Sequence, residues 1–234
     1  MSSYISGRNP VRELLRARQK TVNKILVSNR AHGSAIEEIL KLAGEAKIPV
    51  HHVPPEKLDS LKLENNQGVA AEVSSADYLE LSELLNRIEN EPNALIVVLD
   101  GIEDPHNLGA IIRSAVAFGA NGIVIGKWRS AGLTETVQRT SAGASEHIPI
   151  ARVSNIAECL NRLKEAGVWV LGAEAGNKDI RQETISFPAA LVIGSEGRGL
   201  HRLVKERCDV LVSIRQTSKI SSLNASCAAT VLLY

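Results

Sequence analysis

The 234-residue chain is 44% hydrophobic and 23% charged, which is ordinary for globular proteins and argues against general disorder. Its 27 basic and 26 acidic residues leave a net charge of +1, which excludes an all-over basic nucleic-acid coat but allows a local basic face. Only 3% of the residues are aromatic, so we do not expect stacking on an aromatic platform to be the main mode of any RNA binding.

The sequence carries no pattern typical of membrane insertion or secretion. No apolar run approaches the roughly 20 residues of a membrane span, and the N-terminus MSSYISGRNPVREL has no apolar signal-peptide core. The three cysteines, Cys159, Cys208 and Cys227, show no CxxC spacing, which argues against a disulfide framework or a zinc knuckle. We therefore expect a protein of a reducing compartment, the cytoplasm, without membrane contact.

Charge divides the chain into three parts. Residues 1–75 hold 11 basic and 8 acidic residues, residues 76–92 hold one and five, and residues 93–234 hold 15 and 13. The acidic middle has leucine and isoleucine at helical spacing and ends in Glu89-Asn90-Glu91-Pro92, which predicts a linker that carries a short helix. We therefore expect one domain over 1–75, a linker over 76–92 and a second domain over 93–234.

The pattern of residues 1–75 is typical of a small α/β domain. It predicts helices over 10–19 and 34–46, the second capped by Ser34, and strands over 24–27, 49–53 and 69–73. The first 30 positions hold one acidic residue, Glu13, and seven basic ones: Arg8, Arg12, Arg16, Arg18, Lys20, Lys24 and Arg30. Such a run is either a solvated helix face or a surface that contacts phosphates, and the sequence leaves both open.

Residues 93–234 alternate between apolar strands and helices. Continuous apolar runs predict strands over 94–99, 122–126, 168–171, 189–193 and 210–212. Helical spacing predicts helices over 108–118, 134–142 and 155–166, and a last helix from Ser222 toward the C-terminus. This alternation predicts an open, mostly parallel sheet with helices on both faces, in which the ligand site lies beyond the carboxyl ends of the strands.

The first of three loops at such strand ends runs from Asp100 into a helix. Asn107 is placed to cap that helix, which is also its purely structural explanation. Arg113 lies six residues later on an otherwise apolar helix, where it is either a surface arginine or a charge that needs partners. Glu196 and Asn224, from the other two loops, are the partners we expect.

The second and third loops are rich in small residues. Gly194-Ser195-Glu196-Gly197-Arg198-Gly199 follows a buried strand, and its glycines allow the backbone to approach a ligand closely. Their spacing fits neither a Walker loop nor a dinucleotide fingerprint, and Glu196 also fits a simple turn carboxylate. Ser222-Leu223-Asn224 opens the last helix, where Ser222 also fits a helix cap.

The three loops in this order resemble the motifs of the SpoU (TrmH-type) RNA ribose 2′-O-methyltransferases of the SPOUT superfamily. The matching residues are Asp100-Gly101, Asp104-Pro105-x-Asn107-Leu108-Gly109-Ala110 and Arg113-Ser114-Ala115, then Gly194-Ser195-Glu196-Gly197-x-Gly199-Leu200, then Ser222-Leu223-Asn224-Ala225-Ser226. Ser141-Ala142-Gly143-Ala144 and His147-x-Pro149 also match. The resemblance covers all of residues 93–234.

This resemblance implies a deep trefoil knot whose loops hold S-adenosylmethionine through the main chain of Gly194, Ile214 and Leu223. It also implies catalytic residues that act on the ribose 2′-hydroxyl. Arg113 would face this hydroxyl, and the side chains that orient Arg113 and the ribose would be those of Asn107, Glu196, Ser222 and Asn224. No metal is expected, since the sulfonium leaving group is already activated, and the domain is expected to form a homodimer.

The N-terminal part narrows the resemblance. Tyr4-Ile5-Ser6-Gly7, the basic helix and Gln67-Gly68-Val69-Ala70-Ala71 are similar to the ribosomal-protein-like RNA-binding module of the RlmB-like branch, which methylates guanosine in 23S rRNA. The resemblance implies an RNA-binding surface that includes Arg8, Arg12 and Arg16. Two alternatives stay open: a tRNA ribose 2′-O-methyltransferase, and a knotted RNA-binding protein without catalysis.

The chain also departs from the family pattern. Relatives usually carry Pro-Met and then Gly in the third motif, where this chain has Arg215-Gln216 and Ser218. This difference predicts a weaker cofactor affinity or a different substrate surface. Relatives generally continue the last helix beyond the position of Tyr234, which affects the expected dimer interface.

Overall fold

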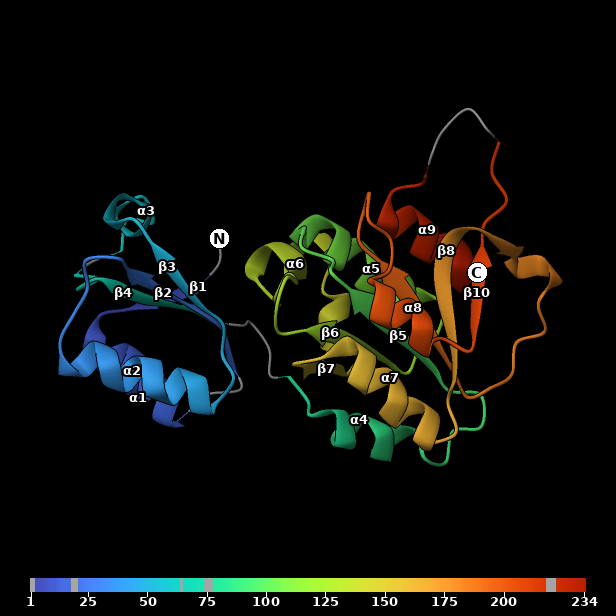
Figure 1. Ribbon diagram of the computed structural model, residues 1–234, viewed down its shortest axis with the longest axis horizontal. Helices are drawn as coiled ribbons and strands as arrows, with labels where there is room; N and C mark the ends of the chain where they lie inside the picture. Colours follow the sequence, from blue (N-terminus) through green and yellow to red (C-terminus); the bar gives the residue numbers. More distant parts are fainter. Residues whose placement is uncertain (1–2, 18–20, 64, 74–77, 218–221) are drawn as a thin grey trace. The chain divides into compact units, whose positions relative to one another are not determined.

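The computed structural model describes residues 3–17, 21–63, 65–73, 78–217 and 222–234, and its chain divides into two compact units. The first comprises residues 1–77 together with the segment 132–136, and the second comprises 78–131 and 137–234 (Figure 1). In the described part of the chain, no helix is both long and apolar enough to cross a membrane.

The first unit is a four-stranded sheet with helices on both faces. Its elements are β1 (Ser3–Ser6), α1 (Arg8–Ala17), β2 (Val22–Ser28), α2 (Ser34–Glu45), β3 (Val50–Val53), α3 (Pro55–Asp59) and β4 (Val69–Val73). The strand order is β1-β4-β2-β3, and only the β2–β3 pair is parallel. Alternate residues of β2 face opposite sides, because Ile25 packs with α1 and α2 whereas Leu26 packs with α3.

The second unit is a six-stranded sheet in which every strand pair is parallel. Its strands are β5 (Leu95–Asp100), β6 (Gly122–Gly126), β7 (Ile150–Val153), β8 (Trp169–Asp179), β9 (Ala189–Gly194) and β10 (Val210–Ser213), in the order β10-β8-β9-β5-β6-β7. Its α-helices are α4 (Leu81–Ile88), α5 (Pro105–Ala117), α6 (Glu135–Thr140), α7 (Ile156–Glu165), α8 (Arg202–Arg207) and α9 (Ala225–Leu233). The short 3₁₀ turns η2 (Ala144–Glu146) and η3 (Ile180–Gln182) complete it.

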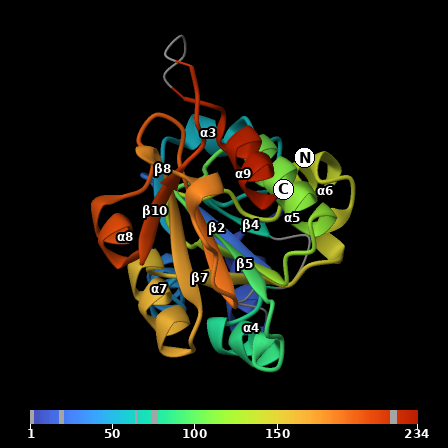
Figure 2. The same cartoon turned by 90° about the vertical axis from the view of Figure 1, so that its right-hand side faces the viewer.

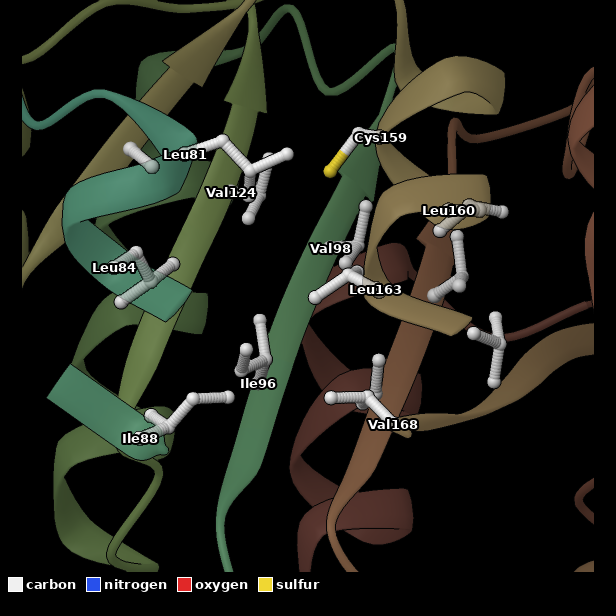
Figure 3. Packing of buried hydrophobic residues seen from close by; sticks show 14 of the residues in the cluster. Leu81, Leu84, Ile88, Ile96, Val98, Val124, Cys159, Leu160, Leu163 and Val168 are labelled. Atoms are coloured by element: carbon white, nitrogen blue, oxygen red, sulfur yellow. The ribbon is translucent and has the colours of Figure 1, made fainter. Parts of the chain in front are cut away.

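Helices cover both faces of this sheet, as the alternating pattern predicts. Helices α4, α7 and α8 share one apolar core with the strands, whereas α5 and α9 lie side by side on the other face (Figure 2). Figure 3 shows Leu84 of α4 and Leu163 of α7 packing with Ile96 of the central strand β5, and all three are fully buried. The predicted fold class, a parallel α/β sheet preceded by a small α/β domain, is therefore confirmed.

The helix predicted within the linker belongs to the second unit's core. Leu81, Leu84 and Ile88 of α4 are buried against β5 and β6 (Figure 3). The fit is tight, because a Cβ at Gly122 would lie 2.5 Å from a methyl group of Leu84. Positions 76 and 77 of the predicted linker lie outside the described residues.

Several local predictions differ from the structure. The helix over 34–46 is capped at Gly33 without a side-chain hydrogen bond, so the prediction of a Ser34 cap is wrong. Besides the 3₁₀ turns η2 and η3, four strands and α-helices of the described residues were not predicted, namely β1, α3, β7 and α8. All four are short, and the strand β7 contains the charged residue Arg152, so none shows the apolar run or periodicity on which the prediction depends.

Candidate functional site

The three predicted loops meet beyond the carboxyl ends of the parallel strands. Asn107 lies in the first turn of α5 after β5, Glu196 lies in the glycine-rich loop after β9, and Asn224 begins α9. The Asn107 amide donates to Glu196 Oε1 at 2.9 Å, and the Asn224 amide donates to Asn107 Oδ1 at 3.0 Å. Asn224 also donates to Glu196 Oε1, so one carboxylate joins all three motifs.

Glu196 faces the N-terminus of α9, where a negative charge is favourable. The main-chain N–H of Ala225 points to its Oε1 at 3.4 Å, and the exposed N–H groups of a helix start carry partial positive charge. Asn224 Oδ1 caps the helix by accepting from the N–H groups of Ser226, at 2.9 Å, and Cys227, at 3.2 Å. The prediction that this helix starts at Ser222 is therefore wrong by three residues.

The α5 helix is capped by Asp104, so the predicted Asn107 cap is wrong. Asp104 Oδ1 accepts from the N–H of His106 at 2.9 Å, and Pro105 begins the helix. This shift has a consequence for the site. Because Asp104 satisfies the helix start, the Asn107 side chain is available to bridge Glu196 and Asn224.

Arg113 is not part of this cluster. A helix turns about 100° per residue, so Arg113 lies about 120° around α5 from Asn107. Ser114, almost in line with Asn107, bonds Thr230 of α9 at 2.7 Å. Arg113 is exposed, and among the described residues it has no hydrogen bond or ion pair. The expected contacts of Arg113 with Glu196 and Asn224 are therefore absent, and its catalytic role stays a prediction.

The glycine-rich loop is a closed turn whose shape requires glycine. Ser195 and Gly199 exchange two main-chain hydrogen bonds, of 2.9 and 3.2 Å. A Cβ at Gly194 would lie 2.5 Å from the Gly199 oxygen and from the Leu200 nitrogen, so no side chain fits there. From outside, Glu174 holds this turn: it accepts from the N–H of Leu200 at 3.4 Å and pairs with Lys205 at 2.6 Å.

Sequence reasoning missed Glu174. It lies in the second half of β8, which continues far beyond the predicted end at residue 171. The extension has the sequence Gly172-Ala-Glu-Ala-Gly-Asn-Lys-Asp179, which contains no apolar run, and the register of β8 against β10 shifts within it. Its position after the buried segment 168–171 was the available signal.

A cleft of about 330 Å³ opens between the glycine-rich loop and the start of α9. Gly194, Ile214 and Leu223, the residues expected to contact a cofactor, all line it, as do Ser222 and Glu196. Its volume is at the lower end of the range usual for small-molecule sites. Among the described residues the N–H groups of Ile214 and Leu223 have no hydrogen-bond partner, so both are available to a ligand.

The departures from the family pattern lie at the rim of this cleft. Arg215 and Gln216 are exposed, and Gln216 lines the cleft. Ser218 lies outside the described residues.

A second, polar cleft of about 560 Å³ lies beside the first and shares Ser195, Glu196 and Arg198 with it. Its wall includes His201. Both oxygens of the buried Asp100 bond His201, one at its ring Nδ1 (2.9 Å) and one at its N–H (2.7 Å). The His201 ring is therefore held in a fixed orientation at the cleft wall.

The predicted RNA-binding arginines of the first unit are hydrogen-bonded within that unit. Arg12 and Arg16 pair with Glu38, at 3.3 and 2.5 Å, and Arg8 donates to the Gln67 carbonyl at 3.2 Å. Burial acts to raise the pKa of Glu38, but the hydrogen bonds and charges of Arg16 and Arg12 together outweigh it and lower that pKa. Of the basic run, Arg18 and Lys20 lie outside the described residues.

No cluster of three or more His, Cys, Asp or Glu side chains suited to a metal ion occurs among the described residues. Cys159, Cys208 and Cys227 are free thiols. Burial raises the pKa of both Cys159 and Cys208 to about 12, so these two thiols are poor nucleophiles at neutral pH.

Comparison with known proteins agrees with the motifs. Residues 94–234 match the model of the SpoU rRNA methylase family, and residues 4–79 match a domain described as RNA 2′-O ribose methyltransferase substrate binding. The chain belongs to the SpoU rRNA methylase family. It is 45% identical over 233 residues to YacO of Bacillus subtilis (strain 168), whose name assigns it to the TrmH family of tRNA/rRNA methyltransferases. That match covers 99% of this chain and 93% of the relative.

Two solved structures differ in how much of the chain they match. An rRNA methyltransferase from Sinorhizobium meliloti with bound AdoMet is 26% identical with a TM-score of 0.62, covering 99% of this chain and 85% of that one. A TrmH/SpoU tRNA-modifying enzyme from A. aeolicus is 25% identical with a TM-score of 0.55. It covers only 66% of this chain and 79% of that one.

Proposed function

We propose that this protein transfers a methyl group from S-adenosylmethionine to the 2′-hydroxyl of a guanosine ribose in large-subunit (23S) rRNA. The observation that carries the proposal is the meeting of the three motif loops at Glu196, beside a cleft lined by Gly194, Ile214 and Leu223. Neither a simple turn carboxylate nor a simple helix cap explains why one carboxylate accepts from Asn107, Asn224 and Ala225 together.

The residues of the first cleft fit S-adenosylmethionine. The closed glycine turn leaves backbone rather than side chains at the cleft wall, and the N–H groups of Ile214 and Leu223 are available as donors. When bound there, the cofactor supplies a methyl group on a positively charged sulfonium, which needs no metal to activate it. Glu196 lines both this cleft and the polar cleft next to it, and Ser222 lines the first.

The chain's own residues would position the ribose rather than remove its proton outright. Hydrogen bonds hold Asn107, Glu196 and Asn224 in fixed orientations. The remaining hydrogen-bond donors and acceptors of each side chain therefore point in a fixed direction. A guanidinium stays protonated in proteins, so Arg113 would act by stabilising charge that develops on the 2′-oxygen. Its exposed place on α5 leaves it available to the substrate.

The first unit favours rRNA over tRNA as the substrate. The structure of an rRNA methyltransferase matches nearly the whole chain, whereas that of a tRNA-modifying enzyme matches about two thirds of it. The match to the substrate-binding domain falls on residues 4–79, which lie almost entirely within the first unit. We propose that this unit selects the RNA and that Arg8, Arg12 and Arg16 exchange their internal partners for phosphates.

We also propose that the protein works as a homodimer in the cytoplasm. An apolar groove of about 990 Å³ includes Ile185, Phe187, Val231 and Tyr234, all with exposed side chains. A monomer rarely exposes such a surface without a partner, and these residues adjoin α9. We propose as well the deep knot that the family resemblance implies. The free thiols support the cytoplasmic location, because they suit a reducing compartment.

The cofactor part is tested by calorimetric titration with S-adenosylmethionine in the presence of a chelator. We expect binding without any divalent ion, and competition by S-adenosylhomocysteine. No heat and no competition would support the alternative of a knotted RNA-binding protein without catalysis.

The substrate part is tested by mapping 2′-O-methylation on total cellular RNA with and without the gene. We expect one ribose methylation of 23S rRNA to disappear with the gene and to return when it is restored. A lost methylation in tRNA, with 23S rRNA unchanged, would contradict the rRNA assignment and support the tRNA alternative.

A further inference from the structure

A loop that the family motifs do not include forms part of the second, polar cleft. This cleft lies where the loops after β5, β6 and β9 come together, and strands β9, β5 and β6 are neighbours in the sheet. The β5 loop contributes Glu103 and Asp104, the β9 loop contributes Glu196 and Arg198, and the β6 loop contributes Arg129. The carboxyl ends of three adjacent strands thus surround one cleft, as substrate sites of parallel sheets require.

The β6 loop, residues 127–131, is held rigidly at both ends. The N–H of Lys127 donates to the Val153 carbonyl at 2.8 Å, and the N–H of Ala131 donates to the Ile102 carbonyl at 2.7 Å. Between them Arg129 has a φ of 50°, a left-handed conformation that costs free energy for any residue with a Cβ. Such a conformation persists only where the surroundings fix it. The backbone at Arg129, and with it the direction in which the side chain starts, is therefore fixed.

The two arginines of this cleft have charged side chains that no ion pair neutralises within the described part of the chain. Neither Arg129 nor Arg198 forms a hydrogen bond or ion pair with another described residue, and both are exposed. Most of the nearby carboxylates are already engaged. Asp104 caps α5, Glu196 accepts from two asparagines, and Asp100 bonds His201. Glu103 is the remaining carboxylate of this group.

Trp128 stands directly before Arg129 and is 50% exposed. It is one of two tryptophans in a chain with only 3% aromatic residues, and the other, Trp169, is half-buried in β8. An exposed indole flanked by Lys127 and Arg129, on a rigid loop beside a polar cleft, combines a stacking surface with cations. Unpaired RNA bases bind to proteins by this combination.

We infer that Trp128 stacks on an unpaired base of the RNA while Arg129 and Arg198 contact the phosphates beside it. The inference rests on the proposed function, since it makes the polar cleft the place where the RNA strand passes the methylation site. This mode of binding differs from an aromatic platform, because a single indole stacks on one base while the arginines bind the phosphates of the strand.

Two single-tryptophan proteins test the stacking directly. Trp169→Phe leaves Trp128 as the only indole, and Trp128→Phe leaves Trp169. The probe is an RNA hairpin with a ten-nucleotide loop of mixed sequence, beside the same hairpin with an abasic loop. We expect the mixed loop to quench the fluorescence of the Trp169→Phe protein, and the abasic loop to quench it far less. Quenching in neither protein, or equal quenching in both, overturns the stacking role.

Salt dependence separates the indole from the arginines. We expect Trp128→Ala to weaken hairpin binding roughly 5- to 100-fold without changing the slope of log affinity against log salt, because stacking releases no counterions. Arg129→Ala and Arg198→Ala should each reduce that slope by about 0.7, the value for one phosphate contact on a single strand. Arg162→Ala, an exposed arginine on α7, is the matched control and should change neither.

The outcomes distinguish this inference from the proposed function. Binding of S-adenosylhomocysteine should be unchanged in Trp128→Ala, Arg129→Ala and Arg162→Ala, since none of these three residues lines the cofactor cleft. If the parent protein methylates RNA but Trp128→Ala binds the hairpin normally, the inference is overturned and the proposed function stands. If the variants lose hairpin affinity as expected but the parent protein transfers no methyl group, the proposed function fails and this RNA site remains.

Discussion

Arg113 shows that two residues on one helix need not share a site. Six positions separate it from Asn107, which turns its side chain about 120° away from the Glu196 cluster. Its closeness to Asn107 in the sequence suggested a place near the cluster. The rotation of about 100° per residue along the helix instead places it on the exposed face of α5. Its proposed role therefore requires the substrate to reach that face.

We expect Arg113→Ala to remain folded and to bind cofactor but to lose about 10²–10⁴ in turnover, the usual effect of removing one positioned catalytic group. Since Arg113 is exposed and has no partner among the described residues, its loss should shift the free energy of unfolding by less than about 0.5 kcal/mol. Single-turnover methylation and a urea melt measure the two effects.

Arg113→Lys should not restore turnover, because one ammonium cannot reproduce the planar donor fork of the guanidinium. Near-normal single-turnover methylation by folded Arg113→Ala would refute the catalytic assignment. A lower melting temperature with activity reduced only in proportion would point instead to a structural role.

Asp179, at the end of β8, gives a prediction for acid stability. Hydrogen bonds from the Arg181 side chain, at 2.6 and 3.1 Å, and from its N–H, lower the pKa of Asp179 to about 2. A carboxyl whose pKa is depressed on folding contributes stability above its unfolded pKa, near 4, and loses that contribution as the pH falls toward 2.

We therefore expect the urea midpoint of the protein to fall between pH 4 and pH 2, and Asp179→Asn to flatten part of this fall. Arg181→Gln should have the same effect, since it removes the other partner. A variant whose midpoint falls as steeply as that of the parent protein would show that this pair adds nothing to the pH dependence.

At the scale of elements, burial decides what the sequence can predict. The strands β5, β6 and β9 are buried on both faces, so their continuous apolar runs are unambiguous. The edge strand β7 contains Arg152, which is buried and stacks on Tyr78, and the far half of β8 is polar where it pairs with β10. Tertiary contacts that the sequence does not reveal stabilise both segments.

The candidate site, too, could be predicted from the sequence only in part. Its three loops were predicted because parallel strands bring their carboxyl ends to one edge of the sheet. Which side chain caps each helix could not be predicted, since Asp104 and Asn107, or Ser222 and Asn224, are all good caps. Asp104 and Asn224 cap the two helices, and Asn107 and Asn224 both donate to Glu196 from a distant part of the chain.

The glycine turn yields the prediction at this scale. A Cβ at Gly194 would collide with the backbone of Gly199 and Leu200, so Gly194→Ala must open the turn that forms the cofactor cleft. We expect calorimetry to show at least a tenfold weaker affinity for S-adenosylhomocysteine, about 1.4 kcal/mol of binding free energy.

Gly44→Ala, inside α2, is the control. Nothing lies within 4 Å of the added Cβ, so we expect unchanged cofactor affinity and a gain of about 0.5–1 kcal/mol in stability. Unchanged affinity in a folded Gly194→Ala protein would contradict the assignment of this turn to the cofactor.

At the scale of the whole molecule, the charges are local. A net charge of +1 gives no general attraction to RNA, so any steep salt dependence must come from particular surfaces. The first unit holds its arginines beside Glu38, whereas the second holds Arg129 and Arg198 without an ion pair among the described residues. RNA binding and cofactor binding should therefore respond differently to salt.

Glu38 provides the sharpest test of the first unit, because it competes with RNA phosphates for Arg12 and Arg16. Replacing Arg8, Arg12 and Arg16 by Ala should weaken RNA binding and flatten its salt dependence by about 0.7–0.9 log units per lost phosphate contact. Glu38→Gln should act in the opposite direction and strengthen binding at low salt, since it removes the negative charge that both guanidinium groups share and leaves them, among the described residues, only Glu13 as an acidic partner. Cofactor affinity should be unchanged in both variants, because Glu38 and the arginines lie in the unit without the cofactor cleft. Filter binding between about 50 and 200 mM salt measures the slopes. If Glu38→Gln binds RNA no better than the parent protein while the triple variant binds normally, the basic run is a solvated helix face, and the RNA surface of this unit lies elsewhere.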